Sequence, residues 1–400
     1  MSTFVRGNSE LLKRIQTSVG RQVYCWYSSD FHPLERSSLT DLKRGTGGRC
    51  SFNGMVATVF GASGFLGRHV VNKLGKMGTQ IIIAHRGELT EVNRLRVAAD
   101  LGQVLIQPYN LKDENSIRKC IKYSNVVINL VGRDWQTKNY SFAEVHVIGA
   151  RRIARLCKEA CIPTLVHMSA LNATPFPAPY MLRNGSQFLQ SKWEGEEAVR
   201  EEFPDAIIFR PADMVGQEDR FTRYYCSLWR HNMKALPLYK KGTATEKQPV
   251  HVSDVAAGIL IACQDRCWHG RTIQAVGPRR YLLSELVDWF HRLTRRTWKE
   301  WGYFRYNIRY DPIFQLWISI LPCLTLGHPL GNLHWEKVER EAHSDVIDNE
   351  IETLKDLGVE LTLMEDQVPW ELKPYRLYSY AEKENLEFDV VEPPPFIECK

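Results

Sequence analysis

The sequence predicts an α/β protein: a Rossmann-type doubly wound parallel sheet with a smaller, mainly helical C-terminal subdomain and an extended tail. The first observation is a β-branched and aromatic run at 56–60, followed by three glycines and an amphipathic helical pattern at 65–74. That order indicates a buried strand, a tight turn and a helix. The second observation is that strand and helix patterns then alternate along the chain, which is typical of a parallel sheet covered by helices.

The turn after the first strand contains Gly61, Gly64 and Gly67. In a dinucleotide-binding unit the first glycine permits the sharp turn, the second lets the backbone approach the pyrophosphate, and the third lets the helix pack on the strand. The phosphates then lie against free N–H groups at a helix N-terminus. The spacing is G-x-x-G-x-x-G rather than G-x-G-x-x-G, so a glycine-rich turn without a ligand stays open as an alternative.

The end of the second predicted strand, residues 80–84, bears on which dinucleotide binds. An NAD site usually places an acidic residue there to hold the ribose 2′-hydroxyl. His85 and Arg86 stand there instead, and a guanidinium can bind a 2′-phosphate through a charge-assisted fork. Arg68, directly after the third glycine, can assist. We therefore predict NADP(H) rather than NAD(H), the alternative being that Arg86 is an ordinary solvated arginine.

The later elements of this domain follow the same alternation. They are predicted as helix 91–100, strand 104–107, helix 115–123, strand 125–131, helix 142–160, strand 164–168, helix 187–202 and strand 206–209. A short extended piece precedes a last helix, for which Ser253 or Asp254 is expected to be the N-cap. The ligand should lie over the carboxyl ends of the strands.

Length and composition indicate a soluble globular chain that forms two units or one enlarged α/β unit. The 400 residues are 44% apolar and 24% charged, and the net charge of +6 suits a phosphate-bearing ligand or an anionic surface without being diagnostic of either. The cysteines form no C-x-x-C pair, so no metal site is expected. The predicted divisions are a transit peptide at 1–35, a linker at 36–53, the nucleotide-binding domain at 54–275, an aromatic and basic subdomain at 276–365, and a tail at 366–400.

The N-terminal segment has the features of a mitochondrial transit peptide. Basic residues accompany a single acid, Glu10, between positions 1 and 29, and apolar residues can line one helical face. A disordered arm is the alternative.

Four features of the sequence stand in order along the chain: the turn GASGFLG, the strand end NLVG at 129–132, Ser169, and Lys192 on the next helix. With these features the chain resembles the extended or atypical short-chain dehydrogenase/reductases. In that family the chemistry belongs to a serine that orients the carbonyl, a tyrosine that transfers the proton, and a lysine four residues later that holds the nicotinamide ribose. Here Phe188 stands at the tyrosine position. Loss of a positioned general acid costs about a hundred- to ten-thousandfold in rate, so the resemblance implies a pocket that holds its nucleotide without turning it over.

Longer strings, at 54–87, 129–135, 203–221 and 249–259, resemble the nucleotide-binding accessory subunits of mitochondrial NADH:ubiquinone oxidoreductase, complex I. The resemblance extends from about Gly47 to the C-terminal tail. It implies a tightly held NADPH, other complex I subunits as partners, and a place on the matrix face of the inner membrane where the peripheral arm meets the membrane arm. The implied role is to stabilise or help assemble that junction. An active NADP(H)-dependent reductase or epimerase, in which Ser169, Ser191 or a water replaces the tyrosine, is the alternative.

These arguments give one set of candidate site residues. No catalytic residue is expected, because Ser169, Phe188 and Lys192 form a degenerate version of the family's triad. The predicted cofactor-binding residues are Gly61, Ser63, Gly64, Phe65, Leu66, Gly67, Arg68, Arg86, Asn129, Val131, Ser169 and Lys192.

The C-terminal third is where a partner surface is expected. Between 289 and 317, arginines and lysines interleave with tryptophan, tyrosine and phenylalanine, which suits an anionic lipid interface or an acidic protein partner. A lid with its aromatics packed inward is the alternative, and an RNA-binding member of the fold is a weaker one. Because no RNA-binding motif is present, no nucleic acid is expected.

The apolar window 313–326 contains Pro322 and falls short of the roughly 20 residues that a spanning helix needs, so no transmembrane helix is expected. This window is predicted to pack in a core or to dip into the inner-membrane interface. The tail is predicted to be an extended arm on a neighbour, with disorder as the alternative.

Overall fold

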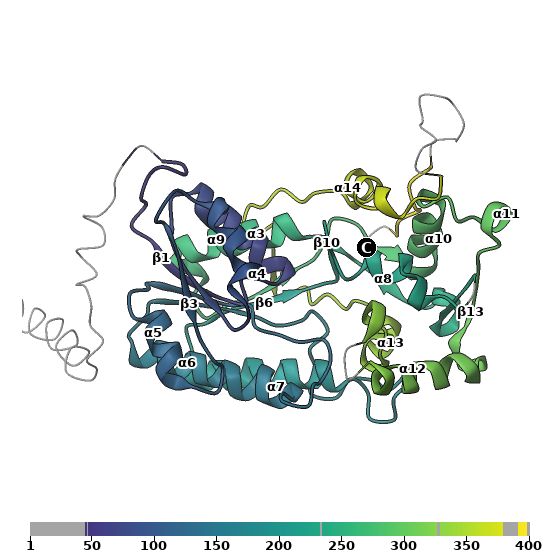
Figure 1. Cartoon of the computed structure of the whole chain (residues 1–400), viewed down its shortest axis with the longest axis horizontal. Helices are drawn as coiled ribbons and strands as arrows, with labels where there is room; N and C mark the ends of the chain where they lie inside the picture. Colours follow the sequence, from purple (N-terminus) through teal and green to yellow (C-terminus); the bar gives the residue numbers. More distant parts are fainter. Residues whose placement is uncertain (1–44, 46, 233, 326–328, 379–390, 398–400) are drawn as a thin grey trace, which may run out of the picture.

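The computed structural model describes residues 45, 47–232, 234–325, 329–378 and 391–397. Its centre is an eight-stranded parallel sheet in the order β14-β11-β6-β5-β4-β1-β2-β3 (Figure 1). The strands are β1 (Val56–Phe60), β2 (Gln80–His85), β3 (Val104–Pro108), β4 (Val126–Asn129), β5 (Thr164–Met168), β6 (Ile207–Pro211), β11 (Thr272–Ala275) and β14 (Glu352–Thr353).

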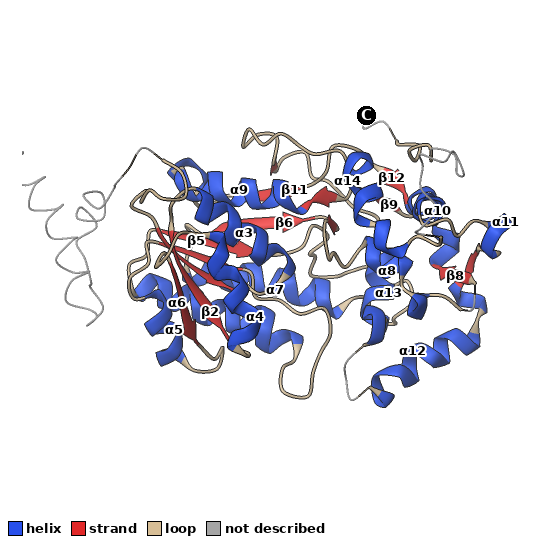
Figure 2. Cartoon of the chain, turned by 45° about the horizontal axis from the view of Figure 1, so that its top comes forward, coloured by secondary structure: helices blue, strands red, loops and turns tan. Residues whose placement is uncertain are grey.

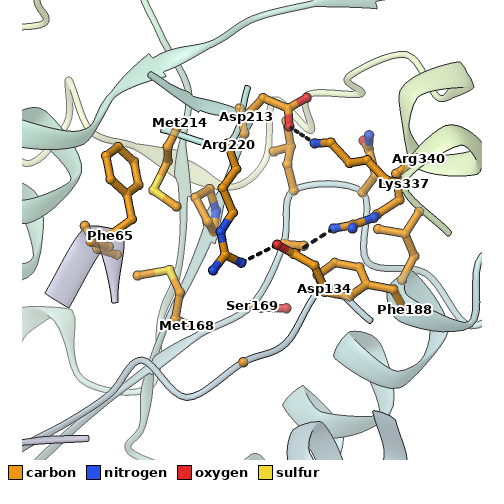
Figure 3. A pocket seen from close by; sticks show the side chains of 18 of the residues that line it. Phe65, Asp134, Met168, Ser169, Phe188, Asp213, Met214, Arg220, Lys337 and Arg340 are labelled. Atoms are coloured by element: carbon orange, nitrogen blue, oxygen red, sulfur yellow. Dashed lines mark hydrogen bonds and ion pairs between the residues drawn. The ribbon is translucent and has the colours of Figure 1, made fainter. Parts of the chain in front are cut away.

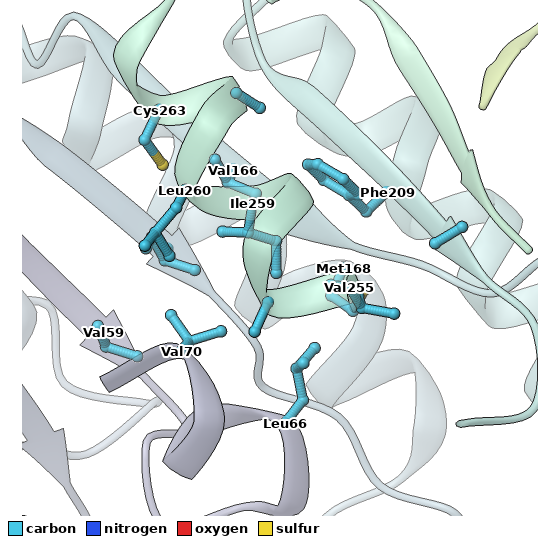
Figure 4. Packing of buried hydrophobic residues seen from close by; sticks show 14 of the residues in the cluster. Val59, Leu66, Val70, Val166, Met168, Phe209, Val255, Ile259, Leu260 and Cys263 are labelled. Atoms are coloured by element: carbon cyan, nitrogen blue, oxygen red, sulfur yellow. The ribbon is translucent and has the colours of Figure 1, made fainter. Parts of the chain in front are cut away.

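Helices cover both faces of this sheet, so the predicted doubly wound fold is confirmed (Figure 1). One face carries α3 (Phe65–Lys76), α4 (Leu89–Asn93) and α9 (Val252–Gln264), and the other carries α5 (Glu114–Ile121), α6 (Gly149–Glu159) and α7 (Gln187–Glu202). Apolar residues of α3 and α9 meet over the strands (Figure 4), and burial of that kind contributes roughly 25 cal/mol per Å².

Most predicted elements lie where the sequence placed them, and β1, β5 and α7 have the expected bounds. The predicted helix 142–160 begins instead as a π-helix, Ala143–Ile148, that continues into α6. The predicted cap of α9 is wrong: His251 is the N-cap and no side chain caps the helix. The Asp254 carboxylate accepts hydrogen bonds from the backbone N–H and the hydroxyl of Thr362, at 2.6 and 3.0 Å, and so it fastens a distant segment.

A second hydrophobic core lies beside the sheet, and Figure 2 shows its helices toward the other end of the molecule from β2 and β5 of the central sheet. Its elements are α8 (Thr222–Cys226), α10 (Leu283–Leu293), α11 (Trp298–Trp301), α12 (Pro312–Leu324), α13 (Trp335–Ala342), α14 (Met364–Glu371), and the strand pair β8 (Ala235–Leu238) and β13 (Phe304–Asn307). Short strands join the two cores: β7 (Met214–Val215) with β10 (Val250–His251), and β9 (Glu246–Lys247) with β12 (Tyr281–Leu282).

The two cores interleave along the chain. Phe221 to Leu238 contribute to the second core, although they precede residue 275. Leu354 and Val359 return to the first core, where β14 pairs with β11. Residues before 275 thus contribute to the second core and residues after 275 contribute to the first, so the two cores do not divide at the expected boundary.

The tail was expected to be extended, but part of it is helical. Residues 364–371 form α14, because Val368 and the adjoining Leu372 are buried in the second core. Near the C-terminus, Ile397 pairs with Arg280 in an isolated bridge. The predicted transit peptide and most of the predicted linker lie outside the described residues.

Helix α12 is amphipathic. Phe314, Ile318 and Leu321 are buried in the second core, whereas the opposite side leaves Ile313 and Leu316 exposed. Within the part of the chain that the structure describes, no helix has both the length and the apolar character needed to cross a bilayer.

Helix α13 ties the two cores together through its carboxylates. Glu336 accepts a hydrogen bond from the Ser186 hydroxyl at 2.9 Å, at the beginning of α7, and a longer one from the backbone N–H of Phe188. Glu339, which is fully buried, accepts from the three backbone N–H groups of residues 180–182, at 2.7 to 2.8 Å. A carboxylate that satisfies three otherwise buried donors fixes the position of α13 against the sheet domain.

We expect Glu339→Gln to lower the free energy of unfolding by about 2–3 kcal/mol, because the amide nitrogen would face backbone donors and leave them unpaired. The measurement is urea unfolding of the full chain. Glu350→Gln, at an exposed position, is the matched control and should change stability by less than about 0.5 kcal/mol. Equal losses in both variants would contradict the role given to Glu339.

Candidate nucleotide-binding site

A cavity of about 300 Å³ opens over the carboxyl ends of β1, β4, β5 and β6 (Figure 3). From β1 the chain proceeds to β2 on one side, whereas β4 lies on the other, so the order of the strands reverses here. Such a switch point is where open α/β sheets bind ligands. The cavity walls come from the glycine turn, the loop after β4, the segment 168–172, the segment 211–214, and α13.

The glycine turn has the geometry of a phosphate cradle. Gly61 has φ +82°, and a Cβ there would lie 3.0 Å from the backbone of Leu130. A Cβ on Gly67 would lie 2.4 Å from the carbonyl oxygen of Gly61, closer than any real contact. Helix α3 begins after Gly64 without a side-chain cap, which leaves its first N–H groups available to an anion. These residues fit a dinucleotide pyrophosphate.

The structure brings some of the predicted residues to the cavity and leaves others away from its walls. Those that line it are Gly61, Gly64, Phe65, Leu66, Gly67 and Ser169. Those outside its lining are Ser63, Arg68, Arg86, Asn129, Val131 and Lys192. Asn129 orders the backbone, because its side-chain oxygen accepts from the N–H of Val131 at 3.2 Å and its amide nitrogen meets His167.

The two predicted phosphate-binding arginines differ in their surroundings. Arg86 is exposed at the end of β2, with its guanidinium 5.0 Å from the centre of the Tyr140 ring. Arg68 is ion-paired with Glu218 at 2.5 Å, and its Nε is buried without a hydrogen-bond partner. Arg86 is therefore the better placed of the two to bind a 2′-phosphate, since no carboxylate among the described residues forms an ion pair with it.

Phe188, at the tyrosine position of the degenerate triad, is enclosed by other side chains. The Phe188 ring packs edge-on against Phe142 and His146, and the Arg340 guanidinium lies 4.0 Å from the centre of that ring. The hydroxyl of Ser169 is buried without a hydrogen-bond partner. An aromatic face against a guanidinium is favourable, but it supplies no proton that a substrate could take.

Lys192 is buried, and its Nζ donates to the backbone carbonyl of Met168 at 3.0 Å. Burial lowers the pKa of Lys192 to about 8, although Asp134 and Glu196 favour its charged form. A Cβ added to Gly132 would lie 3.3 Å from this nitrogen, so Lys192 approaches the loop after β4 closely.

His146, which the sequence did not single out, supports this arrangement. Its Nε2 accepts from the backbone N–H of Arg133 at 3.2 Å, so its Nδ1 carries the hydrogen that meets the Ser191 hydroxyl at 2.8 Å. That hydroxyl donates to the carbonyl of Phe188 at 2.9 Å. Burial, aided by the charge of Lys192, holds the pKa of His146 well below its usual value, and the ring is neutral.

The main group that sequence reasoning missed is a network of charges on the far wall of the cavity. Asp134 is paired with Arg220 at 2.5 Å and with Arg340 at 3.2 Å (Figure 3). Burial alone would raise the pKa of Asp134, but Arg340 and Arg220 outweigh it and hold the carboxyl ionised. No periodic pattern connects these residues, because they lie on three segments that only the fold brings together.

A second part of the network surrounds Lys247. Its ammonium group lies 3.2 Å from Asp213 and 3.3 Å from Asp345, and these carboxylates raise its pKa against the effect of burial. Lys337 of α13 also faces Asp213, at 3.8 Å (Figure 3). The part of the cavity wall that contains Asp134, Asp213 and Lys247 is thus lined by ion pairs within the chain.

The described residues contain no group of histidine, cysteine and acidic side chains that could hold a metal ion.

Comparison with known proteins agrees with this geometry. Residues 57–275 match the model of the NAD-dependent epimerase/dehydratase family. The chain is 41% identical over 370 residues to the mouse protein named NADH dehydrogenase [ubiquinone] 1 alpha subcomplex subunit 9, mitochondrial, covering 92% of each. It is 34% identical over 340 residues to the Neurospora crassa NADH-ubiquinone oxidoreductase 40 kDa subunit, covering 84% of each. The chain belongs to the subunit 9 branch of the epimerase/dehydratase family.

Among solved structures, a putative epimerase from Burkholderia cenocepacia superposes with a TM-score of 0.55 at 16% identity, covering 80% of this chain and 98% of that one. This likeness confirms the epimerase/dehydratase fold. Membership of the subunit 9 branch confirms the resemblance inferred from the glycine turn and the longer strings. The family binds a nicotinamide dinucleotide, which agrees with the cradle formed by the glycine turn.

Lys192 gives a test that depends on pH. Its pKa is lower in the folded chain, about 8, than the ordinary 10.5, so the unfolded chain binds more protons between these values and stability rises with pH there. We expect the stability of the wild type, relative to Lys192→Met, to increase by about 2 kcal/mol between pH 8 and pH 10. Urea unfolding at each pH measures this difference. Lys158→Met, at an exposed position, should show no such change, and a flat difference for Lys192→Met would contradict the lowered pKa.

Proposed function

We propose that the chain is an accessory subunit of mitochondrial complex I that holds a tightly bound NADPH without oxidising it. The names of the mouse and Neurospora crassa relatives support the assembly. The observation that carries the absence of turnover is Phe188 beneath Arg340. At the position where the reductases of the fold place a proton donor, this chain has a hydrocarbon ring covered by a cation.

Different residues of the site would bind different parts of the nucleotide. The N-terminus of α3 would bind the pyrophosphate, Arg86 the 2′-phosphate, and Lys192 the nicotinamide ribose, while Ser169 offers a buried hydroxyl near the nicotinamide end. NADPH can supply a hydride to a carbonyl, which then needs a proton. An arginine side chain stays protonated in proteins, so Arg340 gives up no proton, and Phe188 has no acidic hydrogen. These residues would therefore bind and orient the nucleotide without completing a reduction.

We place the subunit on the matrix face of the inner membrane, with α12 toward the membrane surface or a neighbouring subunit. The exposed side of α12 and the distant helical turn Leu228–Arg230 form one groove, whose exposed apolar lining is Leu228, Trp229, Ile313, Leu316, Trp317 and Ile320, beside His231 and Asn232. Tryptophan beside exposed aliphatic side chains is the composition of interfacial contacts. The helix would lie along the surface and help hold the junction of the two arms.

Retention without turnover is tested on the protein isolated from mitochondria in mild detergent. We expect stoichiometric NADPH to be released only after denaturation, from a fraction of the size of complex I, and no NADPH oxidation by the intact sample. A small particle with a freely exchanging nucleotide and carbonyl-dependent oxidation would instead support an active reductase. Release of NADH alone would reject the choice of nucleotide while keeping the assembly.

The choice of nucleotide is tested at Arg86. Removing one charge-assisted contact costs about 1.5–3 kcal/mol, so Arg86→Gln should weaken NADPH binding by about 10- to 100-fold and leave NADH binding nearly unchanged. Titration calorimetry on the nucleotide-free chain measures both affinities. Arg96→Gln, an exposed neighbour, is the control. An equal loss for the two nucleotides would mean that Arg86 does not contact the 2′-phosphate.

A further inference from the structure

Residues 216–220 form a short segment at the mouth of the cavity, held at both ends. Before it, Val215 of β7 pairs with His251 of β10. Within it, near the C-terminal end, the buried Asp219 carboxylate accepts from the backbone N–H of Thr222 at 2.9 Å and from its hydroxyl at 2.7 Å, at the first residue of α8. Because β7 fixes one end and Asp219 anchors the other, the exposed side chains of Glu218 and Arg220 have more freedom to move than the backbone.

Two ion pairs fasten this segment, one beside the glycine turn and one to a wall of the cavity. Glu218 binds Arg68, directly after the glycine turn, and Arg220 binds Asp134, in the loop after β4, both at 2.5 Å. The Arg220 guanidinium also lies 5.8 Å from the ring centre of Trp135. In Figure 3 the Arg220 side chain runs from beside Met214 to Asp134, across the view of the cavity.

The segment also contacts the glycine turn directly. A Cβ on Gly216 would lie 3.1 Å from the Phe65 ring, so the backbone passes close to the first residue of α3. Glu218 has φ +62°, a left-handed conformation that favours glycine over glutamate. A residue keeps such a conformation only when its surroundings hold it. Here the backbone N–H of Asp219 donates to the carbonyl of Gly216 at 3.0 Å and closes a turn around Glu218, and the ion pair with Arg68 adds a second contact.

These contacts are of the kind that can open. The Glu218 and Arg220 side chains are 59% and 56% exposed, so each ion pair is screened by water and salt and contributes little by itself. Opening of the segment requires both pairs to break, because either one alone keeps the backbone near a wall. The neighbouring Arg223 is exposed and forms no ion pair with the residues that the structure describes.

We propose that residues 216–220 act as a strap that closes the mouth of the cavity and sets how slowly the nucleotide exchanges. The inference rests on the proposed function in one respect, that the cavity holds a nucleotide. In this arrangement Glu218 and Arg220 limit entry as well as exit. Their effect falls on the rates of exchange more than on affinity, which distinguishes a strap from a set of ligands.

The test uses the full chain loaded with NADPH and chased with excess NADP⁺, and the decay of NADPH fluorescence gives the release rate. We expect Glu218→Gln and Arg220→Gln each to speed release by about three- to fivefold, and the double variant by about tenfold. Stopped-flow mixing should show association faster by a similar factor, so that affinity changes by less than about twofold. Arg223→Gln should leave both rates unchanged.

Two results would overturn the strap. Release rates equal to those of the wild type would show that the ion pairs do not limit exchange. Faster release with unchanged association would make these side chains nucleotide ligands instead.

A second measurement separates this inference from the proposed function. Amide hydrogen exchange of residues 61–68 in the nucleotide-free chain should be about tenfold faster in the double variant, since the strap covers the glycine turn. If the wild type retains no NADPH, the proposed function fails, while hydrogen exchange still decides the strap. Identical exchange in the two proteins would reject it.

Discussion

The carboxylate of Asp134, whose side chain is only 20% exposed, is the constraint on which the rest of the structure depends. It lies between the guanidinium groups of Arg220 and Arg340, and its backbone carbonyl accepts a hydrogen bond from His334 Nε2 at 2.9 Å. A carboxylate that is largely removed from water stays ionised at low cost only with cations beside it. The two ion pairs of Asp134 connect the loop after β4 with the segment 216–220 and with helix α13, and so link the nucleotide side of the sheet to the second core.

That arrangement also explains why Phe188 is acceptable at a position where a reductase needs tyrosine. Arg340 is fixed by Asp134, and its guanidinium covers the ring face, where it gains a cation–π contact. Glu336, one turn earlier on α13, binds the first residues of the helix that carries Phe188. The same helix that joins the cores thus lines the cavity beside Phe188. A phenylalanine at this position and a cavity wall formed by α13 are two aspects of one packing arrangement.

The sequence was sufficient for the parts of the fold whose signal is local. Strand β1, the glycine turn and α3 follow one another without a gap, and their apolar periodicity and glycines specify both the structure and the phosphate cradle. The charge network was not predictable, because Asp134, Arg220 and Arg340 are far apart in sequence and only the fold joins them. Asp254 failed as a cap for the same reason: its partner Thr362 lies on a distant segment. Local propensity cannot anticipate a competing tertiary donor.

A retained nucleotide has a thermodynamic use even where no reaction occurs. A ligand that binds the folded chain and not the unfolded one adds RT ln(1 + [L]/Kd) to stability, about 4 kcal/mol at a thousand times Kd. Here the ligand would fill a cavity between the sheet and α13, and satisfy donors such as the buried hydroxyl of Ser169 that lack a partner in the chain itself. A bound dinucleotide would then contribute as part of the core. Slow exchange would preserve that contribution when the concentration of free nucleotide changes, and a glycine cradle without a proton donor would suit such a structural cofactor.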